Sequence, residues 1–120
     1  MHLSSNIQLS SAHYSISGRK TDNEDCVSYC VPNDNLQLTK GACGVIADGV
    51  SSAEAGAAAA QYCVNEFIKD YFDTPDIWTV KKSAQKVLSA INRTLYSRSN
   101  EYLDSRGWVC TFSAIVIKSH

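Results

Sequence analysis

The sequence predicts a mixed α+β domain in which helices cover an antiparallel sheet, and three observations lead to this prediction. Short segments rich in β-branched and aromatic residues lie before residue 50 and after residue 108. Between them, two long segments repeat their apolar residues at helical spacing. With 120 residues, no internal repeat and no low-complexity linker, the chain is the size of one domain at most.

The first segments of the chain are typical of strands. His13–Ser17 alternates polar and apolar side chains, and Cys26–Val31 resumes this pattern after a polar stretch. Residues 32–35 (PNDN) predict a turn. We therefore expect a hairpin in which Leu36 and Leu38 lie on the return strand.

The run Ala42–Ala47 is uncharged and predicts a strand that is buried on both faces. It ends in Asp48-Gly49, and an alanine-rich segment follows, with Ser51 and Glu54 in the pattern of a capping box. An ionised group at such a junction is costly unless a cation, hydrogen bonds or solvent receive it. Asp48 is therefore either a metal ligand or an ordinary turn residue that caps backbone amides.

Two helices and a final strand are predicted in the second half. Apolar residues recur at helical spacing over Ala53–Phe72, and Thr74-Pro75 breaks the pattern. A second helix is predicted over Trp78–Tyr102. The last segment, Val109–Ile117, has apolar residues on both faces and predicts a strand.

The predicted elements leave one face of the sheet uncovered. A buried strand requires pairing on both sides and a cover on both faces, whereas two helices form only one layer. The sequence ends at His120, directly after its most convincing strand. We therefore expect residues 13–120 to be the first part of a larger domain, with residues 1–12 as an N-terminal extension, and we expect this part to pack loosely when isolated.

Charge and cysteine usage narrow the function classes. The net charge is −1, the pI is about 6.3 and the basic residues are scattered, which argues against nucleic-acid and anionic-membrane partners. No stretch approaches the ~20 apolar residues of a membrane span, and no secretory signal is present. The five cysteines include no C-x-x-C pair, so a reduced, cytoplasmic setting is expected. Cys43 and Cys110 lie in apolar runs and are predicted to be small buried hydrophobes.

A second acidic feature, Asn23-Glu24-Asp25, lies where the second predicted strand begins. By itself it is typical of a solvated turn. If this strand and the strand ending at Asp48 were antiparallel neighbours, however, three carboxylates would converge at one end of the sheet. Clustered like charges repel unless a cation lies between them, and oxygen ligands favour Mg²⁺ or Mn²⁺ over zinc.

Three motifs, in this order, resemble the protein phosphatase 2C family of metal-dependent Ser/Thr protein phosphatases. They are KTDNED, then VIADGVSS before an alanine-rich helix, then CTFSAIV. They look most like the bacterial branch in which this domain is fused to a protein kinase, and the resemblance covers residues 13–118. It implies an α+β fold, a four-layer sandwich of two antiparallel β-sheets flanked by helices, represented here by its N-terminal half.

The resemblance also implies a site and a reaction. Glu24 resembles a ligand of one metal ion, with Asp25 beside it. Asp48 resembles the catalytic carboxylate that bridges two Mg²⁺ or Mn²⁺ ions, and Gly49 the residue whose backbone carbonyl also binds. The implied reaction is hydrolysis of phosphoserine or phosphothreonine in a phosphorylated protein substrate by a metal-bridged water. A kinase domain in the same longer chain is an implied partner.

The sequence departs from the family pattern in two respects. Where most members carry a phosphate-binding Arg, this chain has Lys20, with Arg19 next to it, and Lys lacks the bidentate fork. The later metal-binding aspartates have no counterpart, since the remaining candidates are predicted on or beside helices: Asp70, Asp73, Asp76 and Asp104.

These departures leave two alternatives open. The first is a non-catalytic phosphatase-like module that serves in binding or regulation. The second is a phosphate or nucleotide binder that uses the helix start after Gly49, since amides at a helix N-terminus attract anions. Against the second, the glycine spacing of a P-loop is absent and Asp48 would repel phosphate.

Overall fold

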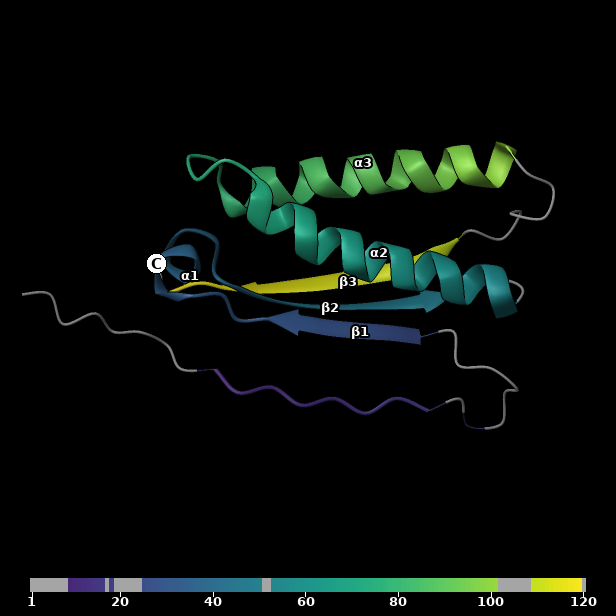
Figure 1. The fold of residues 1–120 in the computed structure, drawn as a ribbon, viewed down its shortest axis with the longest axis horizontal. Coiled ribbons are helices and arrows are strands. Elements are labelled where there is room, and N and C mark those ends of the chain that lie inside the picture. Colours follow the sequence, from purple (N-terminus) through teal and green to yellow (C-terminus); the bar gives the residue numbers. More distant parts are fainter. Residues whose placement is uncertain (1–8, 17, 19–24, 51–52, 102–108, 120) are drawn as a thin grey trace, which may run out of the picture.

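The described part of the chain forms one antiparallel sheet and three helices. The computed structural model describes residues 9–16, 18, 25–50, 53–101 and 109–119. The elements in chain order are β1 (Asp25–Cys30), α1 (Asp34–Lys40), β2 (Ala42–Gly49), α2 (Ala53–Asp73), α3 (Val80–Glu101) and β3 (Cys110–Ile117). The sheet has the order β1-β2-β3 (Figure 1). The predicted α+β class is therefore confirmed, whereas these residues form a single sheet and do not show the two-sheet sandwich.

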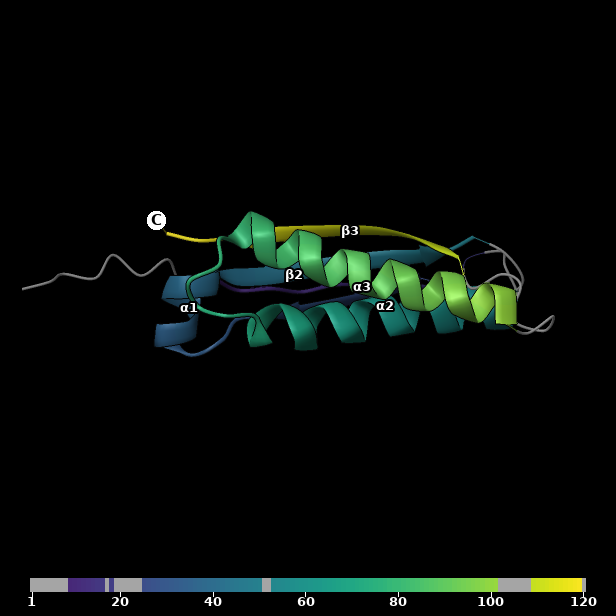
Figure 2. The ribbon, with the colours of Figure 1, turned by 90° about the horizontal axis from the view of Figure 1, so that it is seen from above.

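Helices α2 and α3 lie on the same side of the sheet (Figure 1). Seen from above, both run along the direction of the strands (Figure 2). Their bounds agree with the two predicted helices to within two residues at each end, because the apolar stripes and the break at Thr74-Pro75 are strong local signals. None of the described helices is both long enough and apolar enough to cross a membrane.

The core lies between α2 and the helix-facing side of the sheet. Small residues of α2, Ala59 and Ala60, are fully buried and allow the helix axis to approach the strands closely. Farther along the sheet-facing side of α2, the Phe67 ring stacks on the Tyr71 ring, with centroids 5.5 Å apart. The centroid of the Phe67 ring also lies 5.2 Å from that of the Phe112 ring on β3. This aromatic cluster fixes α2 across the middle of the sheet.

Strand β2 is buried on one face only, so the prediction that both faces are buried was wrong. Its helix-facing residues Cys43, Val45 and Ala47 are at most 3% exposed. On the opposite face, Ile46 is 52% exposed and Asp48 is also exposed. The physical reason is that both long helices lie on the same side of the sheet. The other side, here called the open face, is covered by no helix of the described part of the chain.

Helix α1 replaces the predicted hairpin, and this prediction was also wrong. The Asn33 side chain accepts a hydrogen bond from the Leu36 amide (3.2 Å), which caps the helix start. Gly41 ends the helix with a positive φ of 78° and donates its amide to Gln37 O (2.8 Å). A cap residue at each end thus closes a helix of about two turns, where the apolar alternation had indicated a strand.

The predicted strand at His13–Ser17 is not found. Residues 13–16 have no regular secondary structure, and Ser17 lies outside the described residues. The described segment 9–16 runs beneath the open face of the sheet instead of along a strand edge (Figure 1). From that position its backbone cannot join the hydrogen-bond ladder, because ladder bonds form in the plane of the sheet.

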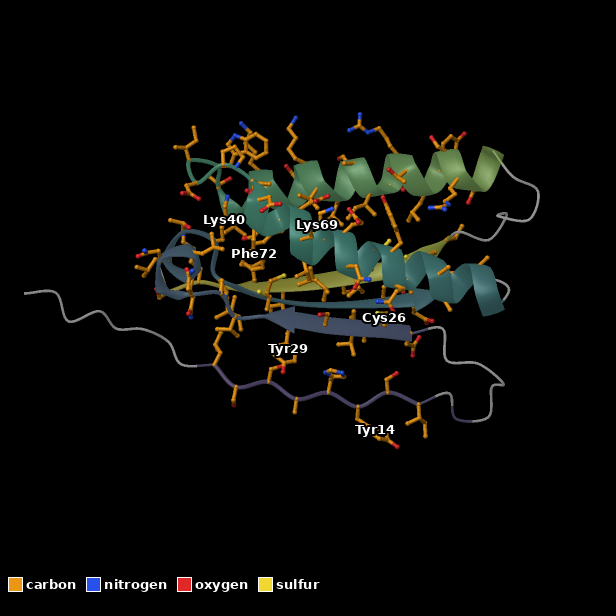
Figure 3. All side chains as sticks on the ribbon, in the orientation of Figure 1. Tyr14, Cys26, Tyr29, Lys40, Lys69 and Phe72 are labelled. Carbon is orange, nitrogen blue, oxygen red and sulfur yellow. The ribbon has the colours of Figure 1, made fainter. Side chains whose placement is uncertain are left out.

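Lys40, at the end of α1, is fully buried and ties α1 to the turn between α2 and α3. Its Nζ donates hydrogen bonds to Pro75 O (2.8 Å) and Ser83 Oγ (2.9 Å), and the Tyr71 hydroxyl donates to Lys40 O (2.6 Å). Figure 3 shows the side chain rising from α1 toward that turn. Burial lowers the pKa of Lys40 because the ammonium loses its hydration.

Candidate functional site

Two of the predicted acidic residues meet at one end of the sheet. β1 and β2 are antiparallel, and Asp25, the first residue of β1, is the direct partner of Asp48 near the end of β2. Directly opposed residues of an antiparallel pair point to the same face. Both carboxylates are exposed on the open face. The predicted convergence of strand start and strand end is therefore confirmed for this pair.

The end of β2 is held in place by a close glycine contact with α2. A Cβ atom added to Gly49 would lie 2.7 Å from Gly56 Cα and closer still to the carbonyl carbon and oxygen of that residue, so only glycine fits here. Directly after the strand, the Val50 amide donates a hydrogen bond to Val109 O (3.1 Å). These contacts hold the backbone at Asp48 and Gly49 in place.

The donor set suits a hard divalent cation but is incomplete among the described residues. Two carboxylates and one backbone carbonyl are oxygen ligands of the kind that Mg²⁺ and Mn²⁺ prefer, and such ions take about six ligands. No group of three or more His, Cys, Asp or Glu side chains gathers within the described ranges. Glu24, the third predicted acid, lies outside those ranges. Waters and ligands from elsewhere would have to complete the coordination shell.

The remaining predicted residues divide into two groups. Asp70 and Asp73 lie near the C-terminal end of α2, and Asp76 follows in the turn to α3, at the end of the helix away from Asp48 (Figure 1). They are too far along the helix to join the pair, as the sequence predicted. The predicted phosphate-binding residues, Arg19 and Lys20, and the acid Asp104 lie outside the described residues.

One member of the acidic pair, Asp25, borders a hollow on the open face. Asp25 lines a cavity of about 400 Å³ together with Val27, Ile46 and the segment 13–16. Farther along the same face, a groove of about 300 Å³ lies between residues 11–13 and the strands. The His13 ring makes an edge contact with Tyr29, with centroids 6.2 Å apart; Figure 3 shows Tyr29 pointing toward this segment. His13 therefore packs on the sheet.

Sequence reasoning missed a pair of thiols close to this end of the sheet. Cys110, the first residue of β3, is the ladder partner of Gly49 and lies with its Sγ 3.2 Å from Sγ of Cys63 on α2. The predicted burial holds for Cys43, which is 3% exposed, but Cys110 is only partly buried. The hydrogen bond between the thiols raises the pKa of Cys63 and lowers that of Cys110. No sequence pattern indicates the pair, because 47 positions separate the two residues.

Comparison of the chain with protein-family models, with curated proteins and with solved structures finds no match. The function is therefore argued from the residues and the geometry described above.

Proposed function

We propose that this chain carries the first part of a two-metal phosphatase site of the protein phosphatase 2C type. Such a site hydrolyses phosphoserine or phosphothreonine in a protein substrate. The observation that carries the proposal is the pairing of Asp25 with Asp48 across β1 and β2. It brings together the NED and ADG motifs, which are 23 positions apart in the sequence and which also carry the family resemblance.

The pairing places two like charges on the same face of the sheet. Directly opposed side chains in an antiparallel sheet have Cβ atoms about 4.5–5.5 Å apart, and like charges at that separation destabilise the sheet. A divalent ion bound at the pair would convert this repulsion into attraction. The exposed position of both carboxylates leaves room for water ligands and for a phosphate group.

Each residue of the proposed site has a definite task. Asp48, Asp25 and Glu24 would hold the metal ions through their carboxylates, and the Gly49 carbonyl would supply a further oxygen. Two Mg²⁺ or Mn²⁺ ions supply a water of lowered pKa and offset charge on the phosphoryl oxygens. Lys20 and Arg19 bind the substrate phosphate as cations. No covalent phosphoenzyme is involved, so neither Ser51 nor the cysteines act as nucleophiles.

Metal binding is tested by thermal melting of the protein in the presence and absence of Mn²⁺. A ligand that binds the folded state raises the thermal midpoint in proportion to the logarithm of its concentration above Kd. We expect Mn²⁺ to raise the midpoint, and we expect Asp48→Asn to abolish this shift. The matched control is Asp73→Asn, which neutralises an exposed acid at the far end of α2 and should retain it. An equal shift in the Asp48→Asn protein would refute the metal assignment.

A non-catalytic binding module is the second candidate, and the open face favours it. Three large apolar side chains of the sheet are well exposed there, Tyr29 at 47%, Ile46 at 52% and Ile115 at 62%. Hydrolysis of a phosphoserine peptide with Mn²⁺ tests the phosphatase directly. Turnover that disappears in the Asp48→Asn protein supports the phosphatase, whereas turnover at an unchanged rate in the Asp48→Asn protein would contradict it.

A further inference from the structure

The two thiols between α2 and β3 are brought together by the packing of α2. Gly56 and Cys63 are seven positions apart and therefore lie on the same face of the helix. Because Gly56 contacts Gly49, this face of α2 lies close to the sheet at the end of β2. Cys110 is the ladder partner of Gly49 and therefore lies beside this contact. As a result the Sγ atoms of Cys63 and Cys110 lie 3.2 Å apart.

We propose that Cys63 and Cys110 form an oxidative modification site, at which a hydroperoxide converts the two thiols into a disulfide that joins α2 to the start of β3. A disulfide bond is about 2.05 Å long, so the sulfur atoms need to approach by only about 1.2 Å. This inference does not depend on the proposed phosphatase activity.

The exposure of the two side chains sets the order of the steps. Cys63 is 3% exposed, whereas Cys110 is only partly buried and is the thiol that a small oxidant can reach. Cys110 Sγ attacks one oxygen of hydrogen peroxide, the O–O bond breaks, and the products are a sulfenic acid and water. Cys63 Sγ then attacks the oxidised sulfur and the S–O bond breaks. The hydroxyl leaves as water with the thiol proton of Cys63. In sum, two thiols lose two hydrogen atoms and one peroxide becomes two waters.

The other three cysteines provide an internal comparison. Cys26 and Cys30 lie on β1, and Cys30 is the ladder partner of the buried Cys43 on β2. All five thiols are free in this structure. Several other cysteine pairs could therefore form a disulfide, and selective linkage of Cys63 to Cys110 would distinguish the proposed pair from them.

Peptide mapping of the unaltered protein tests the linkage directly. The reduced protein is treated with one equivalent of hydrogen peroxide, its remaining thiols are alkylated under denaturing conditions, and it is digested without reductant. Trypsin alone leaves Cys43 and Cys63 on one peptide, residues 41–69, so cleavage after glutamate is added to release residues 55–66. We expect residues 55–66 linked to residues 107–118, and we expect dithiothreitol to reverse the linkage. Linkage of another cysteine pair, with Cys63 and Cys110 alkylated, would overturn the proposal.

Two variants test the order of the steps. In Cys63→Ala no resolving thiol is present, so a sulfenic acid should accumulate on Cys110 and should be trapped there by dimedone. Cys30→Ala is the matched control and should form the Cys63–Cys110 disulfide as the unaltered protein does. A dimedone adduct on another cysteine, with Cys110 unmodified, would overturn the assignment of Cys110 as the oxidised thiol.

The thermal midpoint gives a second readout that needs no variant. A disulfide that closes a loop of this length restricts the unfolded chain, and the oxidised protein should melt on the order of 10 °C above the reduced protein. An oxidised protein that melts at or below the midpoint of the reduced protein would contradict the close native placement of the two sulfur atoms.

Discussion

Removing the hydroxyl of Tyr71 should change how the stability of this protein depends on alkaline pH. The side chain is fully buried, and its hydroxyl donates to Lys40 O at 2.6 Å. Burial raises the pKa of Tyr71 from 10.0 to about 12, because the phenolate would lose its hydration. A folded-state pKa above the unfolded value means that the stabilisation is complete below pH 10 and is lost as the pH rises toward 12.

The magnitude follows from this difference. In full it corresponds to about 3 kcal/mol of preference for the protonated phenol, and roughly half of this preference is lost by pH 11. At neutral pH, Tyr71→Phe should lower the free energy of unfolding by about 1–3 kcal/mol, because a buried carbonyl loses its donor. The aromatic stacking on Phe67 is retained, since only the hydroxyl is removed.

The assay is urea unfolding of both proteins, followed by circular dichroism at several pH values from 8 to 11. We expect the difference in unfolding free energy between them to narrow by about 1 kcal/mol over this range. Taking the difference removes most of the opposite contribution of Lys40, whose lowered pKa adds stability as the pH rises toward 10.5. Tyr96→Phe is the control, because Tyr96 is 70% exposed. A difference that stays constant with pH would refute the argument.

Two further substitutions test packing contacts, one at the end of β2 beside the site and one at the buried Lys40. Gly49→Ala should lower the thermal midpoint, with a cost of about 1–3 kcal/mol or more, because the added methyl group overlaps the backbone of Gly56. Ser83→Ala should cost about 1.5–3 kcal/mol in urea unfolding, since the buried ammonium of Lys40 loses one of its acceptors.

Each of these two substitutions has a matched control. Gly44→Ala adds the same methyl group to β2 at a position where the nearest atom, Ile115 Cγ2, lies at an ordinary contact distance of 3.5 Å. Ser89→Ala removes a hydroxyl from an exposed position of α3. If either control destabilises the protein as much as its partner, the corresponding contact is not the cause.

The candidate site was partly predictable, because its acidic residues lie at the ends of two strands. The acids at the start of β1 and the end of β2 could be recognised from their neighbours in the sequence, and antiparallel pairing was a simple expectation. The exact opposition of Asp25 and Asp48 depends on the register, which the sequence does not state. The Cys63–Cys110 contact was not predictable, since it arises from helix–sheet packing between distant segments.

The sequence by itself determined the two long helices, the three strands of the sheet and the acids at the start of β1 and the end of β2. The same patterns also predicted strands at residues 13–17 and 36–38, which the described residues do not form. Apolar periodicity, breaking residues and β-branched runs act over a few positions, so these signals are complete within each segment. The tertiary structure decided the side of the sheet on which the helices lie, and hence that β2 is open on one face. It also showed that residues 34–40 form a capped helix and brought the buried Lys40 to its acceptors in the α2–α3 region. These outcomes depend on which distant surfaces meet, because burial and side-chain hydrogen bonding become favourable only when the whole chain has packed.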